Sequence, residues 1–186
     1  MLDWLIRRRL AAFEKTYGYD ASYARELLAA NRKGFLRFAR VQAMADCRDG
    51  VPAEAWYAAK LVAVRAEDCG PCTQLSVNMA RAAGVADAVL AAVLRDDLAA
   101  LSADTALAVR YTRAAVARAP ELLALGDEVR QRWGERALTS LALSITAVRI
   151  FPMLKYALGH GHACVRVQVG HETIQPPALQ AAAAHA

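Results

Sequence analysis

Apolar residues recur three or four positions apart along most of the chain, in segments that end at glycine or proline. The first such face consists of Leu2, Leu5, Ile6 and Leu10, and Gly18 follows it. This spacing places the apolar side chains on one side of a helix, and glycine is common just after a helix ends. Hydrophobic residues make up 56% of the chain but aromatic residues only 7%, because alanine and leucine, both strong helix formers, supply the surplus. The sequence therefore predicts an all-α protein.

The chain of 186 residues has the length of one domain with a substantial core. We expect a single helical domain over residues 1–165 and an extended or disordered tail over residues 166–186. The segment CVRVQV alternates like a strand but has no evident partner strand, and QPPALQAAAAHA is low in complexity. The predicted helices are residues 2–17, 22–29, 35–45, 53–65, 72–83, 87–94, 103–119 after a Ser102 cap, 121–133, and 135–158 with an interruption at Pro152.

The formal charge of +5 comes from arginines spread along the chain. Without aromatic interleaving, zinc-finger spacing or a recognisable DNA-reading helix, we expect no nucleic-acid partner. The N-terminus lacks the apolar stretch of a signal peptide, and no later run of about 18 apolar residues predicts a membrane span. We therefore expect a cytoplasmic protein that binds no membrane. In a reducing compartment a close cysteine pair indicates redox chemistry or metal binding rather than a structural disulfide.

The motif AEDCGPCTQL places Cys69 and Cys72 between two predicted helices, at the start of the second. A helix N-terminus favours the thiolate, the reactive form of cysteine, because its unpaired N–H groups and the macrodipole attract negative charge. Two intervening residues allow the sulfurs to close into a disulfide, and Gly70 and Pro71 make the loop tight. The motif therefore favours a reversible dithiol over two core cysteines that fall three apart by chance.

A metal site is the weaker interpretation of the same cysteines, since structural zinc normally takes four nitrogen or sulfur donors. The segment HGHAC offers His160, His162 and Cys164 as further donors. The simpler role for the two histidines is at the polar end of a helix, where an imidazolium complements the dipole. We predict no resident metal and no cofactor.

Glu67 and Asp68 precede the first cysteine. A nearby carboxylate raises the pKa of a thiol, so these two residues oppose the lowering of the cysteine pKa by the helix N-terminus. One of them, if partly desolvated, could instead accept a proton from the dithiol. Glu67 is the candidate base, with the role of an exposed loop acid as the alternative.

Residues 51–85 resemble the carboxymuconolactone decarboxylase and alkylhydroperoxidase D-like superfamily. Their sequence is VPAEAWYAAKLVAVRAEDCGPCTQLSVNMARAAGV. A helix leads into a Cys-x-x-Cys at the start of a second helix that ends in glycine, and Cys69, Cys72 and Gly84 match this pattern. The resemblance implies an all-helical fold that forms homo-oligomers, often trimers or hexamers. It also implies a dithiol that reduces hydroperoxides or the disulfide of a partner protein, with electrons from another dithiol. By this analogy Cys72 is the attacking thiol, although helix-terminus physics alone would as readily choose Cys69.

Two positions depart from the resembled family. Its peroxidase-type members relay protons through a glutamate and a histidine, and this chain has Tyr57 and Ser76 at those positions. Both hydroxyls are poor general bases at neutral pH. Either Glu67, Tyr57 and Ser76 together rebuild the relay or peroxidase activity is weak. The alternative function is a non-catalytic redox sensor or helical scaffold whose disulfide state controls a partner or its own assembly.

Overall fold

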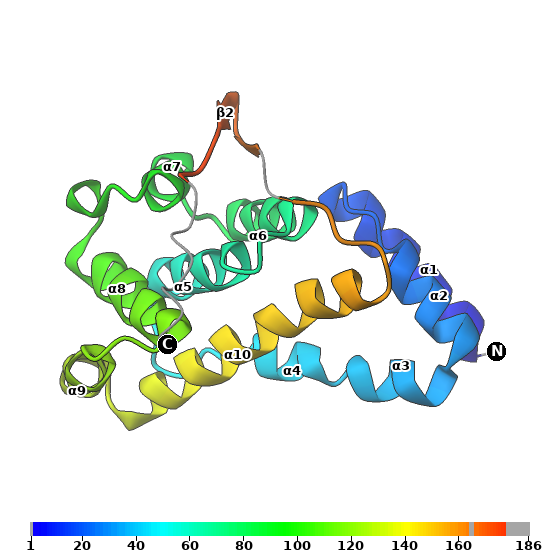
Figure 1. Cartoon of the computed structure of the whole chain (residues 1–186), viewed down its shortest axis with the longest axis horizontal. Helices are drawn as coiled ribbons and strands as arrows, with labels where there is room; N and C mark the ends of the chain where they lie inside the picture. The colour runs from blue at the N-terminus through cyan, green and yellow to red at the C-terminus, as the bar shows by residue number, and fades with distance from the viewer. Residues whose placement is uncertain (1, 164–165, 178–186) are drawn as a thin grey trace, which may run out of the picture.

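The chain is helical over most of its length in the computed structural model, which describes residues 2–163 and 166–177 (Figure 1). The predicted all-α class is confirmed, apart from one small hairpin near the C-terminus. The elements are α1 (Leu2–Tyr17), α2 (Ser22–Ala30), α3 (Arg32–Phe38), α4 (Val41–Ala45), α5 (Ala53–Arg65), α6 (Gly70–Ala82), α7 (Asp87–Arg95), the 3-10 turn η1 (Leu98–Ala100), α8 (Ala103–Ala117), α9 (Leu122–Trp133), α10 (Glu135–Ala157), β1 (Val167–Val169) and β2 (Glu172–Ile174).

Helix α5 lies at the centre of the fold and packs on α6, α7, α8 and α10. Its residues are buried on every side, which explains why its sequence is almost continuously apolar from Ala55 to Val64. One apolar cluster lies between α5, α8, α9 and α10, and a second lies between α5, α6, α7 and the hairpin. A third joins α1, α2 and α3 to Leu75 of α6 and Leu154 of α10. The N-terminal helices therefore form a separate layer against the start of α6 and the end of α10 (Figure 1).

Two predicted helices differ from the structure in continuity. The expected helix 35–45 is divided into α3 and α4, because Phe35 enters the N-terminal cluster while Ala45 enters the cluster around α5 and α10. The expected interruption of 135–158 at Pro152 is wrong, since α10 runs through it. Val148, Pro152 and Lys155 form one buried stripe, so packing on both sides of the proline keeps the two halves in line.

The prediction that the segment around Val167 lacks a partner strand is wrong. Val167 pairs with Ile174 and Val169 with Glu172 in an antiparallel hairpin whose turn includes Gly170. Val167, Val169 and Ile174 are buried against α6 and α7. Within the described part of the expected tail, residues 166–177, the hairpin therefore packs on the core through these three side chains. Cys164 lies outside the described residues.

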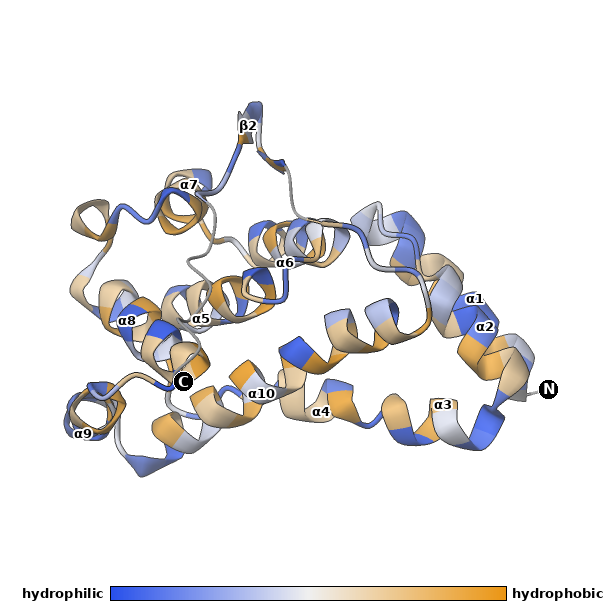
Figure 2. Cartoon of the chain, viewed as in Figure 1, coloured by the Kyte–Doolittle hydropathy of each residue, from blue (hydrophilic) through white to orange (hydrophobic). Residues whose placement is uncertain are grey.

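Among the described residues, α10 is the one helix that length and hydropathy alone would allow to cross a membrane. Its most apolar window has a mean hydropathy of 1.6, and 44% of that window is buried inside the fold. Figure 2 shows apolar residues along much of α10, the helix that packs on α4, α5 and α9. Its apolar composition is thus explained in part by its place in the core.

Lys60 of α5 is a buried charge, with 5% of its surface exposed. Its Nζ donates a hydrogen bond of 2.9 Å to the Ala45 carbonyl and lies 3.9 Å from the centre of the Trp56 ring. Burial lowers the pKa of Lys60 to about 8, and nearby Asp46 partly opposes this effect. The folded state therefore binds a proton at Lys60 less tightly than the unfolded chain does.

We expect the contribution of Lys60 to stability to rise as the pH increases from about 8 to 10.5, because the unfolded chain holds more protons than the folded chain in that interval. The free energy of unfolding of Lys60→Met relative to wild type should be highest below pH 8 and should fall by about 3 kcal/mol across the interval. Urea unfolding at several pH values measures this difference, with the exposed Lys33→Met as a control that should show a flat difference. Parallel pH profiles for wild type and Lys60→Met would contradict the prediction.

Candidate functional site: a buried cysteine pair at the start of α6

The cysteine motif lies where α5 ends and α6 begins. Asp68 has a left-handed backbone, with φ of 48°, and turns the chain toward α6. Cys69 is extended (φ −106°, ψ 101°) and is the residue before the first helical residue, Gly70. Pro71 lies in the first turn of α6, where its missing N–H leaves no helical hydrogen bond unmade. The structure therefore places both sulfurs at the N-terminal end of α6, as the sequence predicts.

Cys69 and Cys72 are brought together as a disulfide, with 5.3 Å between their Cα atoms. Cys69 has no exposed surface and Cys72 is 4% exposed. Together with Val64 they form a small apolar cluster beneath the N-terminal layer. Neither sulfur therefore lies open on the surface.

Hydrogen bonds within α6 and from distant segments hold this turn in place. The carbonyl of Cys69 accepts from both the N–H and the hydroxyl of Thr73, each at 2.9 Å. The Gly70 N–H donates to the His162 carbonyl at 2.9 Å, and the Tyr156 hydroxyl donates to the Asp68 carbonyl at 2.8 Å. The end of α10 and the segment after it thus fix the geometry of the dithiol turn.

Glu67, the predicted base, forms an ion pair with Arg149 of α10, and 11% of its side chain is exposed. Both residues border a groove of about 730 Å³ that is otherwise lined mainly by apolar side chains of α8 and α10. The exposed loop position considered as the alternative is wrong, since Glu67 is largely buried. Its carboxylate pairs with the guanidinium of Arg149, and among the described residues it makes no hydrogen bond to either sulfur.

Tyr57 and Ser76 are not joined to the sulfurs by any polar contact among the described residues. Tyr57 is half-buried, with its ring edge-on to Trp56 at 4.8 Å between centroids. Burial raises the pKa of its hydroxyl, with a smaller effect in the same direction from Tyr17. Ser76 is half-buried one turn beyond Cys72 on α6. A role for these two hydroxyls stays a prediction.

Tyr19 contacts the dithiol, although no local sequence signal predicts this contact. Its Oη lies 4.0 Å from the Cys72 Sγ, and the ring is buried with 7% exposure. Burial is the main cause that raises the pKa of Tyr19, and the neighbouring Tyr23 adds to it. Lys155, 4% exposed, lies over both rings, with its Nζ 4.9 Å from the centre of Tyr19 and 5.4 Å from that of Tyr23.

Lys155 and Tyr19 could not be found from local sequence signals, because they lie on α10 and between α1 and α2, far along the chain from Cys72. Burial lowers the pKa of Lys155, while the charge of Asp20 acts in the opposite direction. Asp20 itself accepts hydrogen bonds from the Ser22 N–H and hydroxyl, and the first of these lowers its pKa. The cluster beside Cys72 thus contains a phenol, an ammonium and a carboxylate from two separate parts of the chain.

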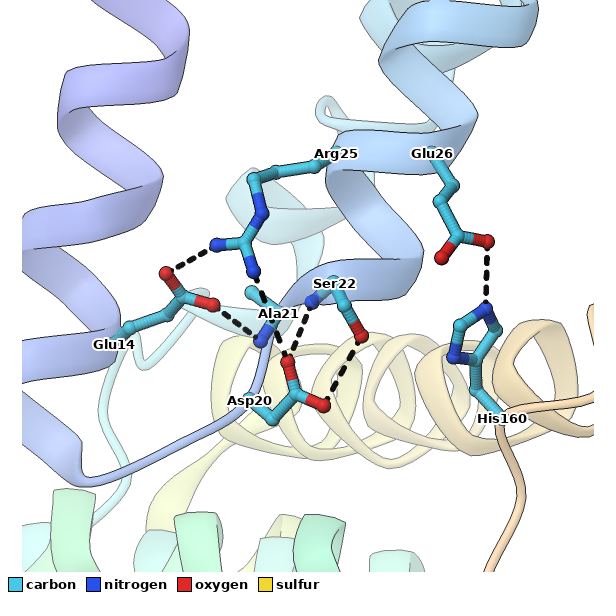
Figure 3. A network of polar contacts seen from close by, with 7 residues as sticks. All are labelled: Glu14, Asp20, Ala21, Ser22, Arg25, Glu26 and His160. Atoms are coloured by element: carbon cyan, nitrogen blue, oxygen red, sulfur yellow. Dashed lines mark hydrogen bonds and ion pairs between the residues drawn. The ribbon is translucent and has the colours of Figure 1, made fainter.

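The segment that carries Tyr19 is fixed by a network of polar contacts (Figure 3). Glu14 accepts the Ala21 N–H at 2.8 Å and also pairs with Arg25, which in turn lies 4.0 Å from Asp20. These contacts tie the end of α1 to the start of α2 on either side of Tyr19. The tyrosine is therefore held over Cys72 by its own segment as well as by packing.

The two histidines among the alternative metal donors lie in different surroundings. His160 Nε2 shares a hydrogen bond of 2.9 Å with Glu26 (Figure 3), whereas the side chain of His162 is exposed. Over residues 2–163 and 166–177, no group of three histidine, cysteine or acidic side chains is arranged to hold a metal ion. Cys164 lies outside these ranges.

Comparisons with known proteins give no relative for this chain: no family model, curated protein or solved structure matches it.

Because Arg149 already engages the Glu67 carboxylate, we expect Glu67→Gln to leave the rate at which dithiothreitol reduces the Cys69–Cys72 disulfide within about twofold of wild type, the range of a substitution away from the reacting atoms. Stopped-flow detection of released thiols measures this rate. Glu128→Gln, which removes the charge from an exposed pair with Arg110, is the control. A loss of about 100-fold or more in Glu67→Gln alone would instead identify Glu67 as a general base.

Proposed function

We propose that this protein is a thiol-dependent oxidoreductase that uses Cys69 and Cys72 to reduce a hydroperoxide or the disulfide of a partner, with electrons from a second dithiol. The observation that carries the proposal is the position of the pair: both sulfurs are at bonding distance, at the N-terminus of the 13-residue helix α6, in a turn held by hydrogen bonds. A helix N-terminus stabilises the thiolate that such chemistry requires. The resemblance to the alkylhydroperoxidase D-like superfamily agrees with this reading and stays part of the proposal.

Reduction of a hydroperoxide would pass through a sulfenic acid on Cys72. The Cys72 thiolate attacks the outer oxygen of ROOH, the O–O bond breaks, and the alkoxide leaves to become ROH by taking one proton. Cys69 then attacks the sulfenic acid on Cys72, the S–S bond forms, and hydroxide leaves as water with the second proton. A dithiol donor afterwards reduces the Cys69–Cys72 disulfide by two exchange steps and becomes a disulfide itself.

Burial of the cysteine pair limits the size of the oxidising substrate that can reach it. A folded protein cannot bring its own disulfide in line with a sulfur that is 0% or 4% exposed unless the covering segment around Tyr19 moves. A hydroperoxide needs far less room. The geometry therefore favours a small hydroperoxide as the oxidising substrate over a protein disulfide.

We expect wild-type protein to consume an organic hydroperoxide in the presence of a dithiol reductant and Cys72→Ser to lose this consumption, because the attacking sulfur is absent. Cys47→Ser is the matched control, since Cys47 is a half-buried free cysteine whose Sγ lies 3.4 Å from the Ser140 hydroxyl in another part of the core. Peroxide loss is followed with a ferrous-xylenol orange assay. Equal rates in wild type and Cys72→Ser would refute the enzymatic proposal.

The same burial also supports a second candidate function, a redox sensor whose disulfide state changes its own assembly. Breaking a disulfide between α6 and the turn beneath Tyr19 would alter packing at the N-terminal layer, which is joined to α6 and α10 through one apolar cluster. Under this alternative the dithiol changes state without turnover.

For the sensor alternative, we expect the oligomer size to change at the reductant potential where two thiols per chain become free. Thiol titration and light scattering across a series of glutathione buffers would measure both quantities on the same samples. A constant oligomer size through complete reduction, together with peroxide turnover, would exclude the sensor in favour of the enzyme.

A further inference from the structure

We propose that Tyr19 is a catalytic residue of the dithiol, whose hydroxyl donates a hydrogen bond to the Cys72 thiolate, and that Lys155 is a positioning residue that holds positive charge beside it. The inference rests on the proposed function, because the thiolate of Cys72 is the species that the reaction requires. Under this inference, Tyr19 and Lys155 stabilise the thiolate charge. The resembled family uses a glutamate and a histidine as a proton relay, and this chain has Tyr57 and Ser76 at those two positions.

The geometry that carries the inference is a contact between residues far apart in the sequence. Tyr19 Oη lies 4.0 Å from Cys72 Sγ in the disulfide state, within reach of an O–H···S hydrogen bond. Tyr19, Cys72 and Lys155 are 7%, 4% and 4% exposed, so little water competes for these groups. In such surroundings, hydrogen bonds and charges act more strongly than they do at the surface.

Tyr19 is suited to donate its proton in a hydrogen bond and not to act as a base. Its burial raises the pKa of the phenol, so the hydroxyl keeps its proton at neutral pH. A negative sulfur accepts hydrogen bonds, and a charge-assisted bond is stronger than one between neutral groups. Forming the Cys72 thiolate would therefore strengthen the contact that the disulfide already makes.

Lys155 supplies the charge that a buried thiolate needs. Its Nζ lies 4.9 Å from the centre of the Tyr19 ring, and the aliphatic stem is buried in the stripe of α10 that faces the N-terminal layer. An ammonium over an aromatic ring is attracted to the ring face, which holds the lysine in position. The ammonium also makes the hydroxyl of Tyr19 a better donor by withdrawing charge from the ring.

The same contact distinguishes the two cysteines. Among the described residues, the Tyr19 hydroxyl contacts Cys72 and not Cys69. The thiolate should therefore reside on Cys72 in the reduced protein, which makes Cys72 the attacking sulfur toward peroxide. When a donor dithiol reduces the disulfide, Cys72 is by the same reasoning the better leaving group, so the donor attacks Cys69. Cys69 has no exposed surface, so this step requires the covering segment to move.

The test measures how fast each cysteine of the reduced protein reacts with iodoacetamide as a function of pH, with Cys69 and Cys72 resolved by peptide mass spectrometry. In Tyr19→Phe we expect the midpoint of the Cys72 profile to move up by about one pH unit and its rate at neutral pH to fall by about tenfold, the effect of one lost hydrogen bond to a charged group. Tyr111→Phe is the matched control, because Tyr111 has the same 7% exposure and lies in another cluster.

Lys155→Met should move the Cys72 profile in the same direction, because it keeps the buried stem and removes the charge. Lys60→Met is the matched control, since Lys60 is also a buried lysine over aromatic rings but lies in the cluster around α5. If Tyr19→Phe loses its helical circular dichroism, the pH profile of Cys72 alkylation in Lys155→Met tests the inference in its place. Among the described residues, the other titratable or charged groups around this site include Tyr23, Asp20, Arg25, His160 and Glu26.

Because the His160 ring lies 6.5 Å from the Tyr23 ring, centroid to centroid, the Tyr19→Phe comparison is repeated in a His160→Gln background, where the shift should persist. An unchanged Cys72 profile in both Tyr19→Phe and Lys155→Met would overturn the inference, even if wild type turns over peroxide. A shifted profile in a protein that reduces no peroxide would support the role of Tyr19 and refute only the proposed function. The two failures are therefore distinguishable.

Discussion

Helix α5 is buried on nearly every side, and four other helices take their positions from it. Because α6, α7, α8 and α10 all pack on this helix, its position determines theirs. Its C-terminal end at Arg65 therefore fixes where the cysteine turn begins and which way α6 leaves it. Arg65 is itself buried and donates to the Leu94 carbonyl, Asp96 and the Pro177 carbonyl, so the same end also anchors α7 and the segment after the hairpin.

The dithiol turn depends in addition on segments that arrive from both ends of the chain. The end of α10 and the segment after it bond to the backbone at Asp68 and Gly70, while the connection between α1 and α2 covers Cys72. Such a site combines a local element, the helix N-terminus, with a side chain from a distant segment that lies 4.0 Å from a sulfur. Buried lysines such as Lys60 and Lys155 carry a cost in stability, because desolvation disfavours the ammonium, and aromatic rings offset part of that cost.

Local sequence patterns predict the features that are set by interactions between neighbouring residues. Helix positions followed from apolar spacing, and the Ser102 cap is present, since its hydroxyl accepts the Thr105 N–H at 3.2 Å. The division between α3 and α4 and the continuity of α10 through Pro152 did not follow, because packing against different clusters decides both. The hairpin was missed because its strands are only three residues each and become stable by burying Val167, Val169 and Ile174 on α6 and α7.

Local sequence patterns are sufficient to predict the helical class, the place of Cys69 and Cys72 at the start of a helix, and the spacing that lets their sulfurs pair. Each of these is set by interactions within a few residues, which a local pattern records. Only the packing of distant helices places Glu67 against Arg149, Tyr19 beside Cys72 and Lys155 over the Tyr19 ring. These groups meet only because α1, α2, α6 and α10 pack together, and contacts between such distant segments leave no periodic trace in the sequence.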